Sequence, residues 1–301
     1  MKKDFFSTLY ELLNISDFGA LKEGFSHFYE DFKQGKILLD SQFRESNTYK
    51  SQPFNTENSL PSKDFGALKL CKAKVLSPLK IRRPKHVTTP QQSAKILHSV
   101  AHIESSAIIL ALDAAYRFKN MPLEFYADWL EVASEEIAHF ELLEGLLNEI
   151  GYKYGDFNVH NGLFYALSAS EGSLKIRMGV VHRGLEAKGL DANPFVLEKL
   201  AQTSLPIHSK IKEVFHIILR DEVGHVGKGD KWWKYALQNE GICTQNAQIN
   251  AFSALCEEFW RFKLCGKVLN SQERLKAGFS KEELRALENL NAKYMTQHTK
   301  K

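Results

Sequence analysis

Residues 122–149 read PLEFYADWLEVASEEIAHFELLEGLLNE, and this stretch decides the fold class. Proline is tolerated in the first turn of a helix, so we expect a helix that begins near Pro122 and ends near Gly151. Its apolar stripe advances in steps of three and four residues, as the buried face of a helix does. The stripe consists of Phe125, Trp129, Val132, Glu136, His139, Leu143 and Leu146. A glutamate and a histidine therefore stand where the pattern calls for apolar side chains.

The same Glu-x-x-His spacing recurs at Glu222 and His225, on a second predicted helix that begins near Pro206. The stripe of that helix is Ile211, Phe215, Ile218, Glu222, His225, Gly229 and Trp232. A further copy, Glu213 and His216, lies on the same helix. Glu213 precedes Glu222 by nine residues, or about 900° of helical rotation, and so faces the opposite side. We interpret this further copy as part of a solvated face.

Each of these two helices is preceded by a helical pattern with one glutamate near its stripe. The first pattern runs from about Pro90 to Phe118, and Glu104 lies among alanines and isoleucine on its apolar face. The third pattern spans about Glu171 to Gly189 and carries Glu186. We expect Asn193-Pro194 to end that helix, because proline removes a backbone donor, and a shorter helix to follow.

Six side chains thus form an ordered series on four successive helices: Glu104, Glu136, His139, Glu186, Glu222 and His225. Residues three apart on a helix share a face and can bind one ion together. Unpaired carboxylates buried in a bundle are costly. Two divalent cations would balance the four carboxylates, with the histidines as neutral donors. The series therefore predicts a two-metal site, and mixed carboxylate and imidazole ligands suit iron or manganese.

The neighbours of these residues are candidates for supporting roles. His182 and Arg183 precede Glu186 by about one turn and could bond to a ligand side chain, and Asp221 could accept the proton of a ligand histidine. His102 lies two residues before Glu104 and should point away from the metals.

The chain has the composition of a globular protein, and because no strand alternation competes with its helical patterns we expect an all-α fold. Helical periodicity also marks residues 5–45, and after Gly241 the segments 246–267 and 280–296, the latter opened by a Ser280-x-x-Glu283 capping box. Residues 46–90 are rich in Ser, Asn, Pro and Lys and indicate an irregular connection. About twenty residues join the second and third long helices, enough to cross a bundle. We expect three regions: an N-terminal extension and linker over 1–89, a four-helix bundle over 90–240, and C-terminal helices over 241–301.

Charge, hydropathy and cysteine spacing indicate where the protein is located and which classes of partner it could bind. The start of the chain lacks the apolar core of a signal peptide, and no uncharged apolar run approaches the length of a membrane span, so we expect a cytoplasmic protein without membrane contact. Cys71, Cys243, Cys256 and Cys265 show no metal-type spacing and are interpreted as free thiols. The net charge of +4 argues weakly for nucleic-acid binding. The basic run Lys80–Lys85 is interpreted as a linker, with contact to an anionic partner left open.

The ordered series resembles the ferritin-like superfamily of di-iron and di-manganese carboxylate proteins, over roughly residues 90–240. A closer resemblance is to a bacterial family of ferritin-like proteins of unknown function. It rests on the segments Ala101–Glu104, Phe125–Leu130, Glu135–Phe140, Tyr154–Phe157, Leu185–Asp191 and Asp221–Val226, and it extends upstream through Arg82-Arg83-Pro84.

The resemblance implies a ferritin-like four-helix bundle with a long crossover between its second and third helices. It implies that Glu136 and Glu222 bridge two metals, with Glu104 and His139 on one ion and Glu186 and His225 on the other. The superfamily includes ferroxidases, manganese catalases and oxygenases such as the tRNA hydroxylase family, so it does not select a reaction. We expect a di-iron, or di-manganese, oxidoreductase that uses dioxygen or peroxide on a small-molecule or RNA substrate, with a redox partner possible. The alternatives are a tRNA-modifying hydroxylase, a stress-protective ferroxidase or peroxide scavenger, and a structural bundle with a degenerate site.

Overall fold

The structure is a computed structural model that describes residues 4–37, 39, 70, 73–81, 84–202 and 204–298. Cys71, Arg82 and Arg83 lie outside the described residues, as does most of the connection predicted over 46–90. The described chain is helical, as predicted, and forms no β-strand; Val75 and Val159 make an isolated parallel bridge. The fold class is therefore an all-α bundle.

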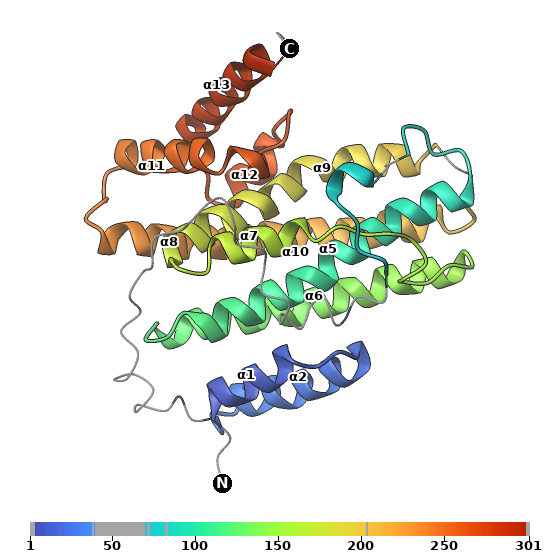
Figure 1. Ribbon diagram of the computed structural model, residues 1–301, viewed down its shortest axis with the longest axis horizontal. Helices are drawn as coiled ribbons and strands as arrows, with labels where there is room; N and C mark the ends of the chain where they lie inside the picture. Colours follow the sequence, from blue (N-terminus) through green and yellow to red (C-terminus); the bar gives the residue numbers. More distant parts are fainter. Residues whose placement is uncertain are drawn as a thin grey trace. The chain divides into compact units, whose positions relative to one another are not determined.

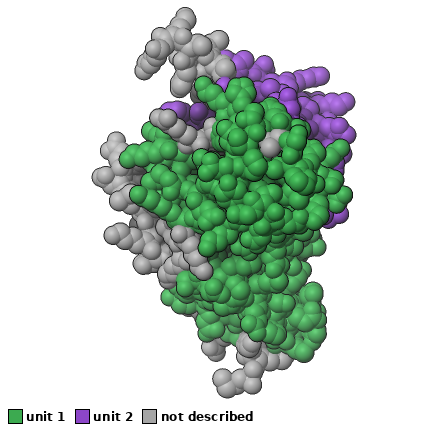
Figure 2. All heavy atoms as spheres, turned by 90° about the vertical axis from the view of Figure 1, so that its right-hand side faces the viewer, with its two compact units in different colours: residues 1–168, 199–214 green, residues 169–198, 215–301 purple. Residues whose placement is uncertain are grey.

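The chain divides into two compact units, which Figure 2 shows in different colours. Unit 1 comprises residues 1–168 and 199–214, and unit 2 comprises residues 169–198 and 215–301. These units group residues by contact rather than by position in the sequence. The predicted region boundaries at residues 89 and 240 stay a prediction.

Unit 1 is built on α5 (Pro90–Arg117) and α6 (Leu123–Glu149), which lie side by side in Figure 1. A capping box starts α5, because the Thr89 side chain accepts from the backbone of Gln92 while the Gln92 side chain bonds back to the backbone of Thr89. The short connection through Asn120, with φ of 62°, turns the chain into α6. Both helices bury the stripes expected of them, including Trp129 and Leu143 at 0% exposure.

Two N-terminal helices, α1 (Phe5–Leu13) and α2 (Phe18–Lys33), pack on this pair. Asp4 and Asp17 cap them by accepting from backbone N–H groups in the first turn. The ring of Phe5 lies 5.0 Å from that of Tyr126 on α6, so aromatic contacts fasten α1 to the pair.

α5 is long and apolar enough to cross a membrane by length and composition, but 78% of the relevant window is buried inside the structure. Burial of this kind is what a core helix of a bundle shows.

The connection after α6 is held by two histidines of α5. Nδ1 of His102 lies 2.8 Å from the hydroxyl of Tyr154, and its Nε2 lies 2.9 Å from the carbonyl oxygen of His160. His98 accepts from the backbone N–H of Gly155. Of the packing and surface roles expected for His102, the structure shows the packing role. The connection also contains a short helix, α7 (Gly162–Ala169), which the sequence analysis missed.

Unit 2 begins with one helical run of three parts: α8 (Leu174–Arg177), the π-helical segment η2 (Met178–Leu185) and α9 (Glu186–Leu200). The prediction that Asn193-Pro194 ends this helix is wrong, because α9 continues through Pro194. Proline deprives the carbonyl four residues earlier, that of Leu190, of its helical donor. The side-chain amide of Asn270 donates to that carbonyl over 3.3 Å and supplies the missing partner.

The rest of the chain comprises α10 (His208–Asn239), which starts in unit 1 and continues in unit 2, followed by α11 (Gln245–Glu258), η3 (Trp260–Phe262), α12 (Ser271–Lys276) and α13 (Lys281–His298). The helix predicted over 246–267 is shorter than expected: α11 ends at Glu258, and the η3 turn that follows ends at Lys263, whose backbone is left-handed. The predicted capping box before α13 is confirmed: Ser280 N–H donates to Glu283, and Glu283 N–H donates to the Ser280 hydroxyl.

Candidate metal centre

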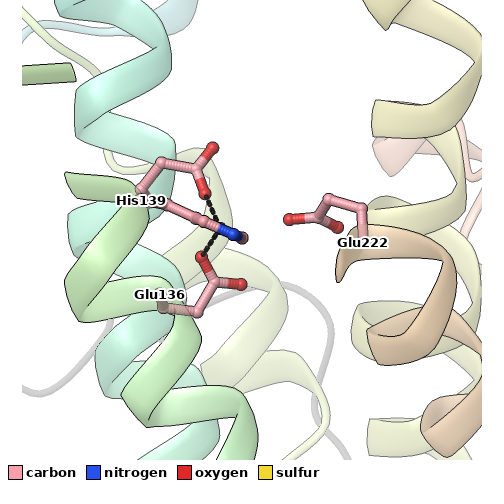
Figure 3. A group of neighbouring side chains, drawn as sticks. Glu136, His139 and Glu222 are labelled. Carbon is pink, nitrogen blue, oxygen red and sulfur yellow. Dashed lines mark ion pairs between the residues drawn. The ribbon is translucent and has the colours of Figure 1, made fainter. Parts of the chain in front are cut away.

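Glu136 and His139 project from the same face of α6, as their spacing predicts (Figure 3). They are 0% and 1% exposed. Glu104 comes from the facing stripe of α5 and is 3% exposed. The position of each residue on an apolar stripe thus correctly predicted its burial.

These three residues form one group, which we call the carboxylate–histidine cluster: Glu104, Glu136 and His139. Nδ1 of His139 lies 3.3 Å from Oε2 of Glu104 and 3.5 Å from Oε2 of Glu136. The ligand atoms of the three side chains all lie within 4.8 Å of one another. Donor atoms at this mutual spacing could hold a metal ion.

The pKa of His139 also indicates that the cluster favours a positive charge. Burial lowers the pKa of His139, but the carboxylates of Glu104 and Glu136 beside its Nδ1 outweigh burial, and the pKa of His139 rises to about 11. The two buried carboxylates thus favour a positive charge at this place. A divalent cation would supply it and balance both negative charges, with His139 as a neutral donor, which makes the donor set a fit for such an ion.

Unit 2 carries a second set of donors on η2, α9 and α10. On α10, Nδ1 of His225 lies 3.7 Å from Oε1 of Glu222, and the His225 side chain is fully buried. At the start of α9, Oε1 of Glu186 lies 2.8 Å from Nδ1 of His182. The side chains of Glu186 and Glu222 are 10% and 15% exposed. We call this second set the unit 2 donor set: His182, Glu186, Glu222 and His225.

The two Glu-x-x-His pairs of α10 differ in burial. Glu213 and His216 are exposed, as their place on the opposite face of α10 predicts, whereas His225 is buried. The predicted hydrogen bond from His182 to Glu186 is confirmed. Asp221 accepts from the guanidinium of Arg220, and its pairing with a ligand histidine stays a prediction. The six-ligand site draws on both units and likewise stays a prediction.

Two buried arginines of unit 2 make ion pairs that the sequence pattern did not indicate. Arg183 donates to Asp230 over 2.7 Å and also to Glu283, and its guanidinium lies over the rings of Trp233, Phe252 and Phe279. The other arginine, Arg274, donates two hydrogen bonds to Asp191. Arg183 was predicted to bond to a ligand side chain, but its guanidinium bonds to Asp230 and Glu283 in the core of unit 2.

The three described cysteines are free thiols, as expected: Cys243, Cys256 and Cys265. Burial raises the pKa of the Cys256 thiol to about 12, with the nearby Cys265 adding to the effect. This thiol is therefore held in its neutral form.

Comparison with known proteins places the chain in a family without placing it in a reaction class. An uncharacterized protein of Haemophilus influenzae is 39% identical over 203 residues, which cover 65% of this chain and 68% of the relative. No solved structure matches the chain. One family matches residues 24–285, a range that contains all six candidate ligands. By that match, the chain belongs to the family described as "Protein of unknown function (DUF455)".

Proposed function

We propose that the chain is a di-iron, or di-manganese, carboxylate protein that oxidises an organic substrate with dioxygen or peroxide. The observation that carries the proposal is the carboxylate–histidine cluster of α5 and α6, whose two carboxylates are buried around a single imidazole. Desolvated carboxylates at this spacing are costly unless a cation balances them.

Charge supports two ions rather than one. The carboxylate–histidine cluster contributes two carboxylates and a histidine, and the unit 2 donor set contributes two carboxylates, Glu186 and Glu222, together with His225. Each group offers the negative charge that one divalent cation neutralises. In this proposal Glu104, Glu136 and His139 would hold one ion, and Glu186, Glu222 and His225 would hold the other.

The donor types favour iron or manganese over a structural zinc site, which would take cysteines or a closed tetrahedral set. When bound, such ions would supply Lewis acidity and sites for a small oxygen species. The protein would contribute fixed ligand geometry, exclusion of water and a substrate site for a small molecule or an RNA, with electrons from a redox partner.

Anaerobic addition of Fe(II), removal of excess metal and elemental analysis test the site. We expect two irons per chain for the wild type and at most one for Glu136→Ala or Glu222→Ala. The matched control is the double variant Glu213→Ala/His216→Ala on α10, which should still bind two. One iron or fewer in the wild type, or full binding by the Glu136→Ala variant, would contradict the proposal.

Dioxygen uptake by the iron-loaded protein then separates the classes of function. Repeated dioxygen uptake that requires both a reductant and an added cell-extract fraction containing small molecules or RNA supports the oxidoreductase proposal. Uptake that stops once the added iron is oxidised supports a ferroxidase or storage role instead.

A further inference from the structure

His182 makes a buried contact with a proposed metal ligand. Its side chain is fully buried, and its Nδ1 lies 2.8 Å from Oε1 of Glu186, the residue four positions later. A neutral imidazole with the proton on Nδ1 donates to the carboxylate at this distance. The contact engages one oxygen of Glu186 and leaves Oε2 as the other acceptor of that side chain.

The backbone around His182 is held in an unusual conformation. Residues 178–185 form the π-helical segment η2, a rare geometry that is frequent at functional sites. The helix returns to α-helical form at Glu186, so His182 lies in the π-helical turn and its partner begins the next regular turn.

A close approach between η2 and α10 fixes His182 further. Gly229 lies so near that a Cβ at this position would stand 2.8 Å from the backbone carbon of His182 and 2.8 Å from its Cβ. Gly229 follows His225 by four residues and therefore shares its face of α10. The missing side chain allows η2 to lie directly against the helix that carries Glu222 and His225. Unit 2 thus positions His182 by close backbone contact with the helix that carries Glu222 and His225.

Carboxylates that bind metals are themselves held by hydrogen bonds, and loss of such a bond weakens metal binding. A carboxylate at the end of a flexible glutamate can otherwise rotate away or bind with both oxygens. A donor fixed on Oε1 prevents both.

We propose that His182 is a positioning residue of the metal centre, which holds Glu186 through Oε1 so that Oε2 serves the metal. This inference rests on the proposed function, since it assigns a role toward the ion that Glu186 would bind. His182 thereby joins the six ligands as a seventh residue of the site, acting through Glu186.

Anaerobic Co(II) titration tests the role, with the visible absorption of bound cobalt reporting its ligands. We expect the wild type to bind two ions. His182→Gln, which moves the donor beyond Glu186, should weaken one of the two ions about 10- to 100-fold and alter its absorption. His182→Asn, which keeps an N–H near the place of Nδ1, should recover most of the affinity. A merely structural role would not distinguish these two polar variants.

A double-mutant cycle separates action through Glu186 from a general effect on folding. In a Glu186→Ala background, His182→Gln should cause no further loss of cobalt affinity. If wild type, His182→Asn and His182→Gln bound cobalt with equal affinity, the inference would be overturned. If the wild type still bound two ions in that case, the proposed function would stand. Equal weakening of both ions by His182→Gln would also overturn the inference. Fewer than two ions in the wild type would instead count against the proposed function itself.

Discussion

The backbone N–H of Gly155 donates to Nε2 of His98 over 2.9 Å, and this bond requires that nitrogen to be unprotonated. Burial lowers the pKa of His98 to about 4, although the charge of Asp156 acts in the opposite direction. The ring also stacks on Tyr154 and meets Phe157 edge to face. A neutral histidine thus fastens the connection after α6 to α5.

This relationship predicts a loss of stability in mild acid. Unfolded His98, with a pKa near 6.5, binds protons more readily than folded His98, so its contribution is present above pH 6.5 and lost as the pH falls toward about 4. With allowance for partial solvent screening, we expect the wild type to lose about 1 to 2 kcal/mol more than His98→Gln between pH 7.5 and pH 5. Urea unfolding at both pH values measures the difference. Equal losses in the two proteins would show that His98 does not titrate in this way.

Gly229→Ala should disturb the packing of η2 on α10. The new Cβ would stand 2.8 Å from backbone and side-chain carbons of His182, so the helices must separate, at a cost of about 1 to 3 kcal/mol. The matched control on the same helix is Gly224→Ala, because a Cβ there meets nothing within 4 Å. That change should be neutral or stabilise by up to about 1 kcal/mol. Thermal unfolding of the metal-free proteins measures the stability of the two variants against the wild type. A Gly229→Ala variant as stable as the wild type would refute the close approach.

Asn270→Ala should destabilise α9 in a way that depends on Pro194. The Asn270 amide serves the Leu190 carbonyl that proline leaves without a helical donor, and loss of such a partner costs about 1 to 3 kcal/mol. Pro194→Ala restores a backbone N–H at the right position. We therefore expect Asn270→Ala to cost less in the Pro194→Ala background, as measured by urea unfolding of all four proteins. Strictly additive effects would mean that Asn270 stabilises the chain by capping α12 alone.

Arg274→Met should be among the most destabilising single changes in unit 2. Asp191 is 3% exposed and accepts two hydrogen bonds from Arg274, together with the backbone N–H groups of Gly266 and Asn270. Removing one partner of a buried pair leaves a desolvated charge and costs about 3 to 5 kcal/mol.

The control for this prediction is Lys293→Met, which removes the cation of an ion pair exposed on both sides. Exposed pairs contribute about 0 to 1 kcal/mol, so this variant should unfold almost as the wild type does. Chemical denaturation compares the two variants. If both variants lowered the free energy of unfolding by a similarly small amount, the ion pair of Arg274 and Asp191 would contribute little to stability.

Sequence periodicity predicted the parts of the molecule that depend on local order. The stripe on α6 correctly placed Glu136 and His139 in the interior, and nine residues of helical rotation correctly placed Glu213 on the surface. The capping box at Ser280 was likewise readable, because both of its hydrogen bonds lie within four residues.

The features that escaped prediction depend on partners far away in the chain. Pro194 indicated the end of a helix, and the residue that makes continuation possible, Asn270, lies 80 residues from Leu190. Arg183 bonds to Glu283 across 100 residues, so nothing near it in the sequence showed that it turns from Glu186 to the core. Two glycines of η2 are also closely packed, since a Cβ at Gly179 would clash with the Leu255 side chain and one at Gly184 would stand 2.9 Å from the Gly179 carbonyl oxygen, and a three-and-four-residue pattern does not reveal this packing.

The long-range partners of Asp191 and Arg183 imply an order of assembly during synthesis. The helix that carries Glu186 is made well before Arg274 and Glu283, which follow their partners Asp191 and Arg183 by 83 and 100 residues. The contacts of the carboxylate–histidine cluster join residues no later than His139 and can form much earlier. A nascent chain stalled before Arg274 should therefore have this cluster in place while η2 and α9 still lack the ion pairs that fasten them.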